Sequence, residues 1–161
     1  MRRIAQFHKV SWNQFQEAFH DTFPSYGDES IQEIYGRIEL PVRATAGSAG
    51  YDFFTPVPVL LEPGESIKIP TGIRAEMNND FVLKLYPRSG LGFKFRLQLN
   101  NTVGIIDSDY FYSDNEGHIF VKLTNCGNKT VEVKAGDRIV QGVFVQYGIT
   151  ADDKVNDERN G

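Results

Sequence analysis

Cysteine is almost absent from this 161-residue chain, because Cys126 is the only one. A single cysteine excludes an internal disulfide and a cysteine-rich zinc site, and we expect Cys126 to be a packing residue. The chain also lacks an apolar run long enough to span a membrane. Met1-Arg2-Arg3 is basic, but the segment after it is too short and too polar for the core of a signal peptide. The cytoplasm is therefore the expected location.

A long block of lysine or arginine is also missing, and 21 acidic against 17 basic residues give a formal net charge of -4. Nucleic-acid-binding domains usually carry a basic face, and a barrel that binds single strands needs aromatic residues interleaved with basic ones. We therefore expect neither nucleic acid nor a membrane as a partner. A polyanionic ligand would need a local pocket of arginine side chains and backbone N–H groups instead.

The overall amino-acid composition is typical of a single globular domain. Hydrophobic residues make up 40% of the chain and charged residues 24%, which argues against a disordered or fibrous protein. The length suits a single domain with a substantial core. We find no internal repeat and no low-complexity stretch.

A helix is predicted near the start of the chain. Ser11 can cap it, and Gln14 lies three residues further on, where it can close a capping box. Trp12, Phe15 and Phe19 then share one helical face. We expect this aromatic face to pack on the domain or on a neighbouring chain.

From Ile34 onward the hydrophobic pattern has a period of two residues, which predicts β-strands. Clusters of turn-forming residues separate the runs. Many short strands at this spacing favour an antiparallel sandwich or barrel, and the absence of strand–helix alternation argues against a doubly wound nucleotide fold. The alternating runs are Ile34 to Leu40, Ile67 with Ile69, Phe81 with Leu83 and Leu85, Leu97 with Leu99, Ile119 with Val121 and Leu123, and Val131 with Val133.

Two loops between these strands carry groups that suit an anion or a metal ion. Residues 46–52 are small and end in the carboxylate of Asp52, which alone indicates no more than a turn. Residues 87–92 combine Arg88 and Ser89 with two glycines. Glycines let the backbone approach an anion closely while the side chains donate hydrogen bonds. The segment is therefore suited to phosphate, although a structural ion pair of Arg88 is an equal alternative.

Two later loops complete the set. Residues 101–110 place an amide, two carboxylates and a phenol within ten residues, with apolar residues between them that can form the floor of a hairpin. A carboxylate held beside a water molecule can act as a general base. Residues 136–141 contain Asp137 and Arg138, which by themselves indicate a turn that enters a strand.

Together and in this order, the four loops resemble those of the trimeric dUTPase family, over roughly residues 34–146. The second and third loops are the most specific part of the likeness. The resemblance implies an all-β, jelly-roll-like barrel and a homotrimer with active sites shared between subunits. It also implies hydrolysis of dUTP to dUMP and pyrophosphate with Mg²⁺ as the cofactor.

The resemblance assigns roles by matching position. Asp107 corresponds to the base that activates water for attack on the α-phosphorus, and Tyr110 to the ring that packs on deoxyribose. Asn101 resembles the amide that pairs with the uracil edge, beside backbone groups of the same hairpin such as Gly104. Asp52 resembles the carboxylate that holds magnesium through water. Phosphate-side and inter-subunit contacts are implied for Arg88, Ser89, Gly90 and Gln141, whereas Arg138 is expected to be structural.

Outside the matched region we expect a partly helical N-terminal extension (1–33), followed by the β domain (34–149) and a mobile tail (150–161). The tail ends in Arg159-Asn160-Gly161, which resembles the start of the family motif Arg-x-Gly-Gly-Phe-Gly-Ser-Thr-Gly. Arg159 is thus expected to bind phosphate, in a truncated motif that allows dUTP binding with poor turnover. Residues 111–118, where the family has Arg-Gly-Glu, are expected to form a surface loop in which His118 is no catalyst.

Two other functions fit the same loops. A dCTP deaminase shares the fold and the hairpin, but that family places a glutamate base in a Thr-Leu-Glu run on the following strand, which here reads Val121-Lys122-Leu123-Thr124-Asn125. A non-catalytic nucleotide-sensing or protein-binding module agrees with the incomplete tail. That alternative gives no reason for both Asp107 and Asp52 to be present.

Overall fold

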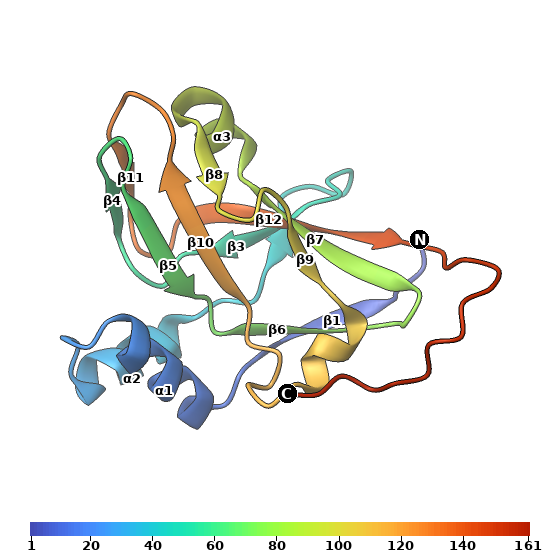
Figure 1. The fold of residues 1–161 in the computed structure, drawn as a ribbon. Helices are drawn as coiled ribbons and strands as arrows, with labels where there is room; N and C mark the ends of the chain where they lie inside the picture. Colours follow the sequence, from blue (N-terminus) through green and yellow to red (C-terminus); the bar gives the residue numbers. More distant parts are fainter.

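The computed structural model describes all residues from 1 to 161, and strands dominate it (Figure 1). The strands are β1 (Ala5–Lys9), β2 (Val42–Arg43), β3 (Tyr51–Phe54), β4 (Val59–Leu61), β5 (Ser66–Pro70), β6 (Ile73–Met77), β7 (Phe81–Pro87), β8 (Leu97–Leu99), β9 (Gly104–Ile106), β10 (Phe120–Asn125), β11 (Val131–Val133) and β12 (Arg138–Gln146). The helices are α1 (Trp12–Thr22), α2 (Asp28–Arg37), α3 (Ser89–Phe95) and the 3₁₀ helix η1 (Ser108–Tyr112).

The strands form four antiparallel sheets. The largest has the order β2-β3-β12-β7-β9, the second has the order β5-β10-β8, and β1-β6 and β11-β4 form two-stranded pairs. Alternate residues of both larger sheets point into one core, for example Leu83 and Leu85 from β7 and Leu123 from β10. The predicted all-β, jelly-roll-like fold is confirmed, although its strands do not close into a single barrel.

Five of the predicted strands are confirmed as β5, β7, β8, β10 and β11. The first prediction, a strand from Ile34 to Leu40, is wrong, because residues 28–37 form α2. Ile34 and Ile38 are four residues apart, a spacing that suits a strand face and a helix face equally well. The buried Ile31, three residues before Ile34, belongs to the helical pattern only.

The predicted N-terminal helix is confirmed as α1. The Ser11 hydroxyl accepts a hydrogen bond of 3.2 Å from the backbone N–H of Gln14, as an N-cap should. The capping box is completed differently from the prediction, since the N–H of Ser11 donates to the carboxylate of Glu116 at 2.8 Å. Phe15 and Phe19 are fully buried, so the aromatic face packs on this chain's own domain.

The N-terminal extension is part of the main core. Strand β1 pairs with β6, and its Phe7 packs its ring 5.3 Å from Tyr51 and 5.6 Å from Phe53 of the largest sheet. Helices α1 and α2 lie beneath β5 in the view of Figure 1. The same core cluster includes Phe15, Phe19 and Ile31 together with residues of β3 to β12.

Two local predictions are wrong. Cys126 is exposed rather than packed, because the buried residue of its turn is Asn125, whose amide donates to the carbonyl of Leu61 at 2.9 Å. Strands β8 and β9 do not pair with each other as a hairpin, since β8 pairs with β10 and β9 with β7. The turn between them contains Thr102 at a φ of 68°.

None of the helices combines the length and the apolar character needed to cross a membrane.

Candidate functional site

Asp107 stands at the end of β9, where the chain turns into η1. Strand β9 can lie close against β7 because Gly104 faces Leu85: a Cβ at Gly104 would be 2.9 Å from the Cβ of Leu85. The side chain of Asp107 is 56% exposed, so water reaches its carboxylate. The geometry therefore presents a water-accessible carboxylate at the end of a strand.

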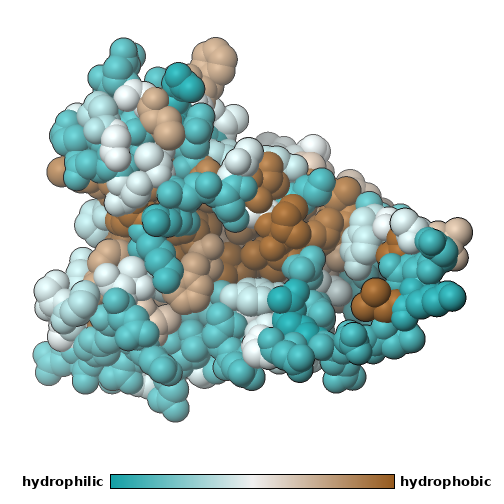
Figure 2. All heavy atoms as spheres, in the orientation of Figure 1, coloured by the Kyte–Doolittle hydropathy of each residue, from teal (hydrophilic) through white to brown (hydrophobic).

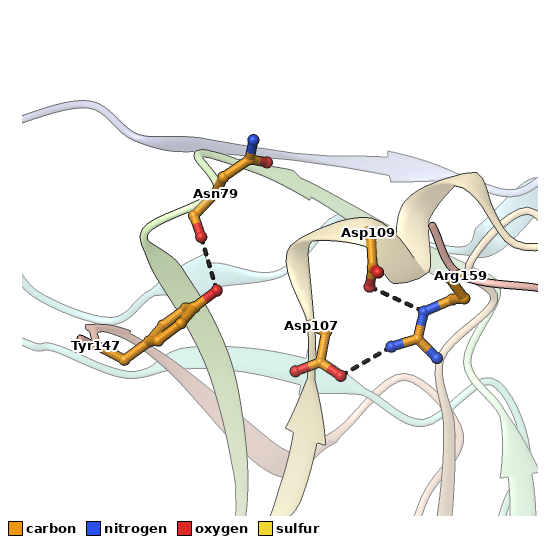
Figure 3. Close-up of polar contacts among 5 residues, drawn as sticks. All are labelled: Asn79, Asp107, Asp109, Tyr147 and Arg159. Atoms are coloured by element: carbon orange, nitrogen blue, oxygen red, sulfur yellow. Dashed lines mark hydrogen bonds and ion pairs between the residues drawn. The ribbon is translucent and has the colours of Figure 1, made fainter. Parts of the chain in front are cut away.

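The guanidinium of Arg159 bridges two carboxylates at this point (Figure 3). Its Nη2 donates to Oδ2 of Asp107 at 2.8 Å, and its Nε donates to Oδ1 of Asp109 at 2.9 Å. The tail starts after β12, which is separated from β9 by β7, and there the hydroxyl of Tyr147 donates to the carbonyl of Asn79 at 2.8 Å. From there it runs along the outside of the molecule and returns to η1 (Figure 1).

Tyr110 lies on η1, and both hydrogen-bonding directions of its phenol are occupied within the chain. Its hydroxyl donates to the carbonyl of His118 at 2.7 Å and accepts from the amide of Asn115 at 2.9 Å. The guanidinium carbon of Arg159 is 5.8 Å from the centre of the ring. The ring face is thus the part of Tyr110 that remains available to a ligand.

The glycine-rich loop at Arg88, Ser89 and Gly90 is exposed and leads from β7 into α3. The N–H of Arg88 donates to the carbonyl of Ile139 at 3.1 Å, which fixes the end of β7. The five ion pairs of this chain do not include Arg88. The alternative of a structural ion pair for Arg88 is therefore not realised within the chain.

Asp52 and Gln141 lie opposite each other on β3 and β12. The side chain of Asp52 is only 12% exposed, and its Oδ2 is 3.4 Å from Nε of Arg138. Arg138 therefore partners Asp52 rather than its neighbour in the sequence, Asp137. A Cβ at Gly50 would overlap the side-chain amide of Gln141, so that glycine makes room for Gln141.

The expected site residues form two separate groups in one chain. Arg88 follows the end of β7, whereas Ile106, next to Asp107, pairs with Leu83 of the same strand. Arg88 is five positions after Leu83, and a strand rises about 3.4 Å per residue, so about 17 Å lies between these points. The phosphate-type loop and the carboxylate therefore do not meet within a single chain.

Comparison with known proteins identifies the family. The sequence model of dUTPase matches residues 36–160. The chain belongs to the dUTPase family. The deoxyuridine 5'-triphosphate nucleotidohydrolase of Lactococcus lactis subsp. lactis is 43% identical over 123 residues, which cover 76% of this chain and 81% of that protein.

Two solved structures carry the same fold. The dUTPase from Streptococcus mutans has 35% identity and a TM-score of 0.65, and the match covers 89% of this chain and 97% of that one. A mutant dUTPase from phage phi11 of S. aureus, described with a structural Mg(II) ion, has 20% identity and a TM-score of 0.65 over 96% of this chain and 98% of that one. The second supports the fold alone.

The expectation that residues 111–118 form a surface loop holds in part: Phe111 and Tyr112 belong to η1 and Asp114 is exposed, whereas His118 is completely buried. Its Nε2 accepts a hydrogen bond of 2.9 Å from the N–H of Gly72, so the proton must be on Nδ1, which lies 2.8 Å from Oε1 of Gln14. Burial lowers the pKa of His118 from 6.5 to about 4. The sequence held no signal for this position, nor for Asp109 as the second partner of Arg159.

We expect acid to destabilise this dUTPase through His118. Below about pH 6.5 the unfolded chain binds a proton at this residue that the native state does not bind until about pH 4. The free energy of unfolding should therefore fall by on the order of 1 kcal/mol per pH unit through this window. Urea unfolding of the wild type and of His118→Asn between these pH values measures the slope, which should be smaller in the variant.

The matched control for this measurement is His8→Asn, since His8 is more than a third exposed and lies 3.9 Å from its nearest carboxylate, that of Glu76. This variant should keep the wild-type slope. Equal slopes in the wild type and His118→Asn would contradict the assignment of the acid sensitivity to His118.

Proposed function

We propose that this chain hydrolyses dUTP to dUMP and pyrophosphate, with Asp107 as the general base. The observation that carries the proposal is the position of Asp107, which is water-accessible at a strand end and binds Arg159, whose guanidinium lies 5.8 Å from the ring of Tyr110. Membership of the dUTPase family supports the same reaction.

The chemistry follows from the free oxygen of the carboxylate. Arg159 binds Oδ2 of Asp107, and Oδ1 accepts no hydrogen bond from the protein, so it can accept one from water. Asp107 takes a proton from that water as the oxygen attacks the α-phosphorus. The bond from this phosphorus to the bridging oxygen breaks, and pyrophosphate leaves with the electron pair.

Arg159 has two alternative partners in this scheme. In the free chain its guanidinium binds Asp107 and Asp109, and phosphate oxygens offer it the same bidentate geometry. We infer that Arg159 exchanges the carboxylates for the phosphates of a bound nucleotide. The exchange frees the base at the moment when the substrate is in place.

Selection of the base and the sugar is assigned to the residues around Asp107. Asn101 lies exposed in the turn between β8 and β9, where its amide and the backbone near Gly104 can pair with a uracil edge. A wrong exocyclic group would leave buried polar atoms unpaired, which makes such readout steep. The ring face of Tyr110 is assigned to the deoxyribose, where a rigid aromatic leaves no space for a 2′-hydroxyl.

Magnesium fits this donor set as an ion carried by the substrate. No group of three or more His, Cys, Asp or Glu side chains converges in the chain, and Mg²⁺ on a triphosphate takes most of its ligands from phosphate and water. Asp52 is the carboxylate that would hold it through water, with Arg138 on one of its oxygens. When bound, the ion neutralises phosphate charge and improves the leaving group.

A homotrimer with shared sites is inferred from the separation of the two groups of residues. About 17 Å of strand β7 lies between the Arg88 loop and the point next to Asp107, which is too far for both to act on one triphosphate. A second copy must therefore supply the loop, and the three-fold symmetry is what the family resemblance implies.

Large apolar side chains that are exposed in the single chain support such contacts between subunits. Among them are Val42, Leu60, Phe93 and Ile105. Figure 2 shows an apolar hollow on one face of the molecule.

The deciding experiment is pyrophosphate release from dUTP, dCTP, dTTP and UTP, with magnesium and with excess chelator. We expect dUTP to exceed each other nucleotide by about 100-fold or more in kcat/KM, and the chelator to remove most of the activity. Ammonia released from dCTP would instead identify a deaminase. Binding of dUTP without release of any product would favour the non-catalytic module.

The cytoplasmic location stays a prediction, which a deoxynucleoside triphosphate substrate supports.

A further inference from the structure

Helix α1 contacts the loop behind Tyr110 through pairs of residues that are more than 100 positions apart in the sequence. Gln14 binds the imidazole of His118, and Ser11 binds the carboxylate of Glu116. Both contacts connect the start of α1 with residues 113–118, which follow η1 directly. The N-terminal extension is thus attached to the segment that carries the sugar-side tyrosine.

The contact at His118 depends on hydrogen bonds at both ring nitrogens. The imidazole is fully buried and uses both nitrogens, one toward Gly72 and one toward Gln14. Its own backbone carbonyl accepts the hydroxyl of Tyr110 at 2.7 Å. The position of that carbonyl, and with it the position of the phenol, therefore depends on the two partners of the ring.

The contact at Glu116 holds the loop in a conformation with two consecutive positive φ angles, 62° at Glu116 and 71° at Gly117. The two carboxylate oxygens bind the N–H and the hydroxyl of Ser11 at 2.8 Å and 2.6 Å. A Cβ at Gly117 would lie 2.6 Å from the carbonyl oxygen of Tyr110. The loop thus folds back on η1 at a place that only glycine fits.

We propose that Gln14, Glu116 and His118 are positioning residues that hold Tyr110 rigid for the exclusion of ribonucleotides. This inference rests on the proposed function, in which the ring of Tyr110 packs on the deoxyribose. An aromatic ring excludes a 2′-hydroxyl group only if the ring cannot move away from the sugar. The phenol of Tyr110 is held in place by two hydrogen bonds within the chain. The discrimination between dUTP and UTP therefore depends on a helix that does not contact the nucleotide.

The test compares two substitutions of Gln14. Gln14→Met keeps the size of the side chain but removes the acceptor of the Nδ1–H bond, whereas Gln14→Glu keeps an acceptor oxygen. The readout is the ratio of kcat/KM for dUTP to that for UTP, which general damage to the fold would not change. We expect this ratio to fall about tenfold in Gln14→Met, which corresponds to the loss of one hydrogen bond. In Gln14→Glu the ratio should keep its wild-type value.

Two variants close to the ring make the result independent of the folding of α1. Asn115→Ala removes one hydrogen bond of the phenol and leaves the contacts of α1 intact, and Tyr110→Phe removes both bonds but keeps the ring. Both should lower the dUTP/UTP ratio in the same direction as Gln14→Met. If Gln14→Met does not fold, Glu116→Ala decides, because it releases the loop from Ser11 without altering α1 itself.

Calorimetric binding of dUMP and UMP measures the same discrimination without turnover. A wild-type chain that releases no pyrophosphate from dUTP would overturn the proposed function, and the binding ratio of the variants would still decide the role of Gln14 and His118. Folded Gln14→Met and Asn115→Ala proteins with the wild-type preference for the deoxy sugar, in an active enzyme, would overturn the positioning role alone.

Discussion

Asp107→Asn is expected to lower kcat for dUTP hydrolysis by about 100- to 10,000-fold, the usual contribution of a general base. The amide has nearly the shape of the carboxylate but cannot take the proton of the attacking water. Affinity for dUTP should change little, because the substitution leaves the phosphate loop, Asn101 and Tyr110 unaltered. Single-turnover release of pyrophosphate measures the chemical step, and calorimetry with a non-hydrolysable dUTP analogue measures the binding.

Asp109→Asn is the matched control. Asp109 lies two residues from Asp107, has the same 56% exposed side chain, and binds the same guanidinium at 2.9 Å rather than 2.8 Å. The control therefore removes an equal charge from the same loop without removing the base, and kcat should stay within about tenfold of the wild type. Equal losses in both variants would mean that the charge around Arg159 matters and the proton transfer at Asp107 does not.

Phe15→Ala is expected to lower the free energy of unfolding by about 3–5 kcal/mol, the usual cost of a buried phenylalanine. Phe15 is completely buried, with its ring 5.5 Å from Phe19, 5.4 Å from Tyr35 and 6.2 Å from His118. A Cβ on Gly72 would lie 3.4 Å from the same ring, so the neighbouring backbone is packed closely against it. Such a loss would demonstrate that the N-terminal extension belongs to the folded core.

Tyr112→Ala serves as the control for this experiment, since Tyr112 is an aromatic residue that is 77% exposed. Its removal should change the stability by no more than about 1 kcal/mol. Urea unfolding is followed by circular dichroism and by the fluorescence of Trp12, the only tryptophan, which lies on α1. An early, separate transition of Trp12 in the wild type would contradict a common core for α1 and the sheets.

Strands can be predicted from the sequence where apolar and polar residues alternate without a competing period. Ile67 with Ile69 and Val131 with Val133 are examples that the structure confirms as β5 and β11. Alternation is misleading at Ile34, because residues four apart satisfy both periods and only Ile31, three residues earlier, distinguishes the helix from the strand. The cap at Ser11 was predictable because it acts on a neighbour three residues away.

The functional groups of a single loop and the family could also be predicted from the sequence. Asn101, Asp107 and Tyr110 lie within ten residues of one another, so the sequence alone shows that they belong to one loop. The sequence did not show that Cys126 is exposed and His118 buried, because a turn residue is buried or exposed according to what packs on it. Asn125 rather than Cys126 faces the core, and His118 lies under α1.

The features that can be read from the amino acids alone are therefore local: the alternating strands, the capped helix, and the loops that carry the dUTPase residues. Which of these segments meet depends on the folded chain. It brings Gln14 to His118 and Arg159 to Asp107 across distances of 104 and 52 residues, and it holds Arg88 apart from Asp107 along β7. Local patterns arise from backbone geometry over a few residues, whereas such contacts depend on the packing of the entire core.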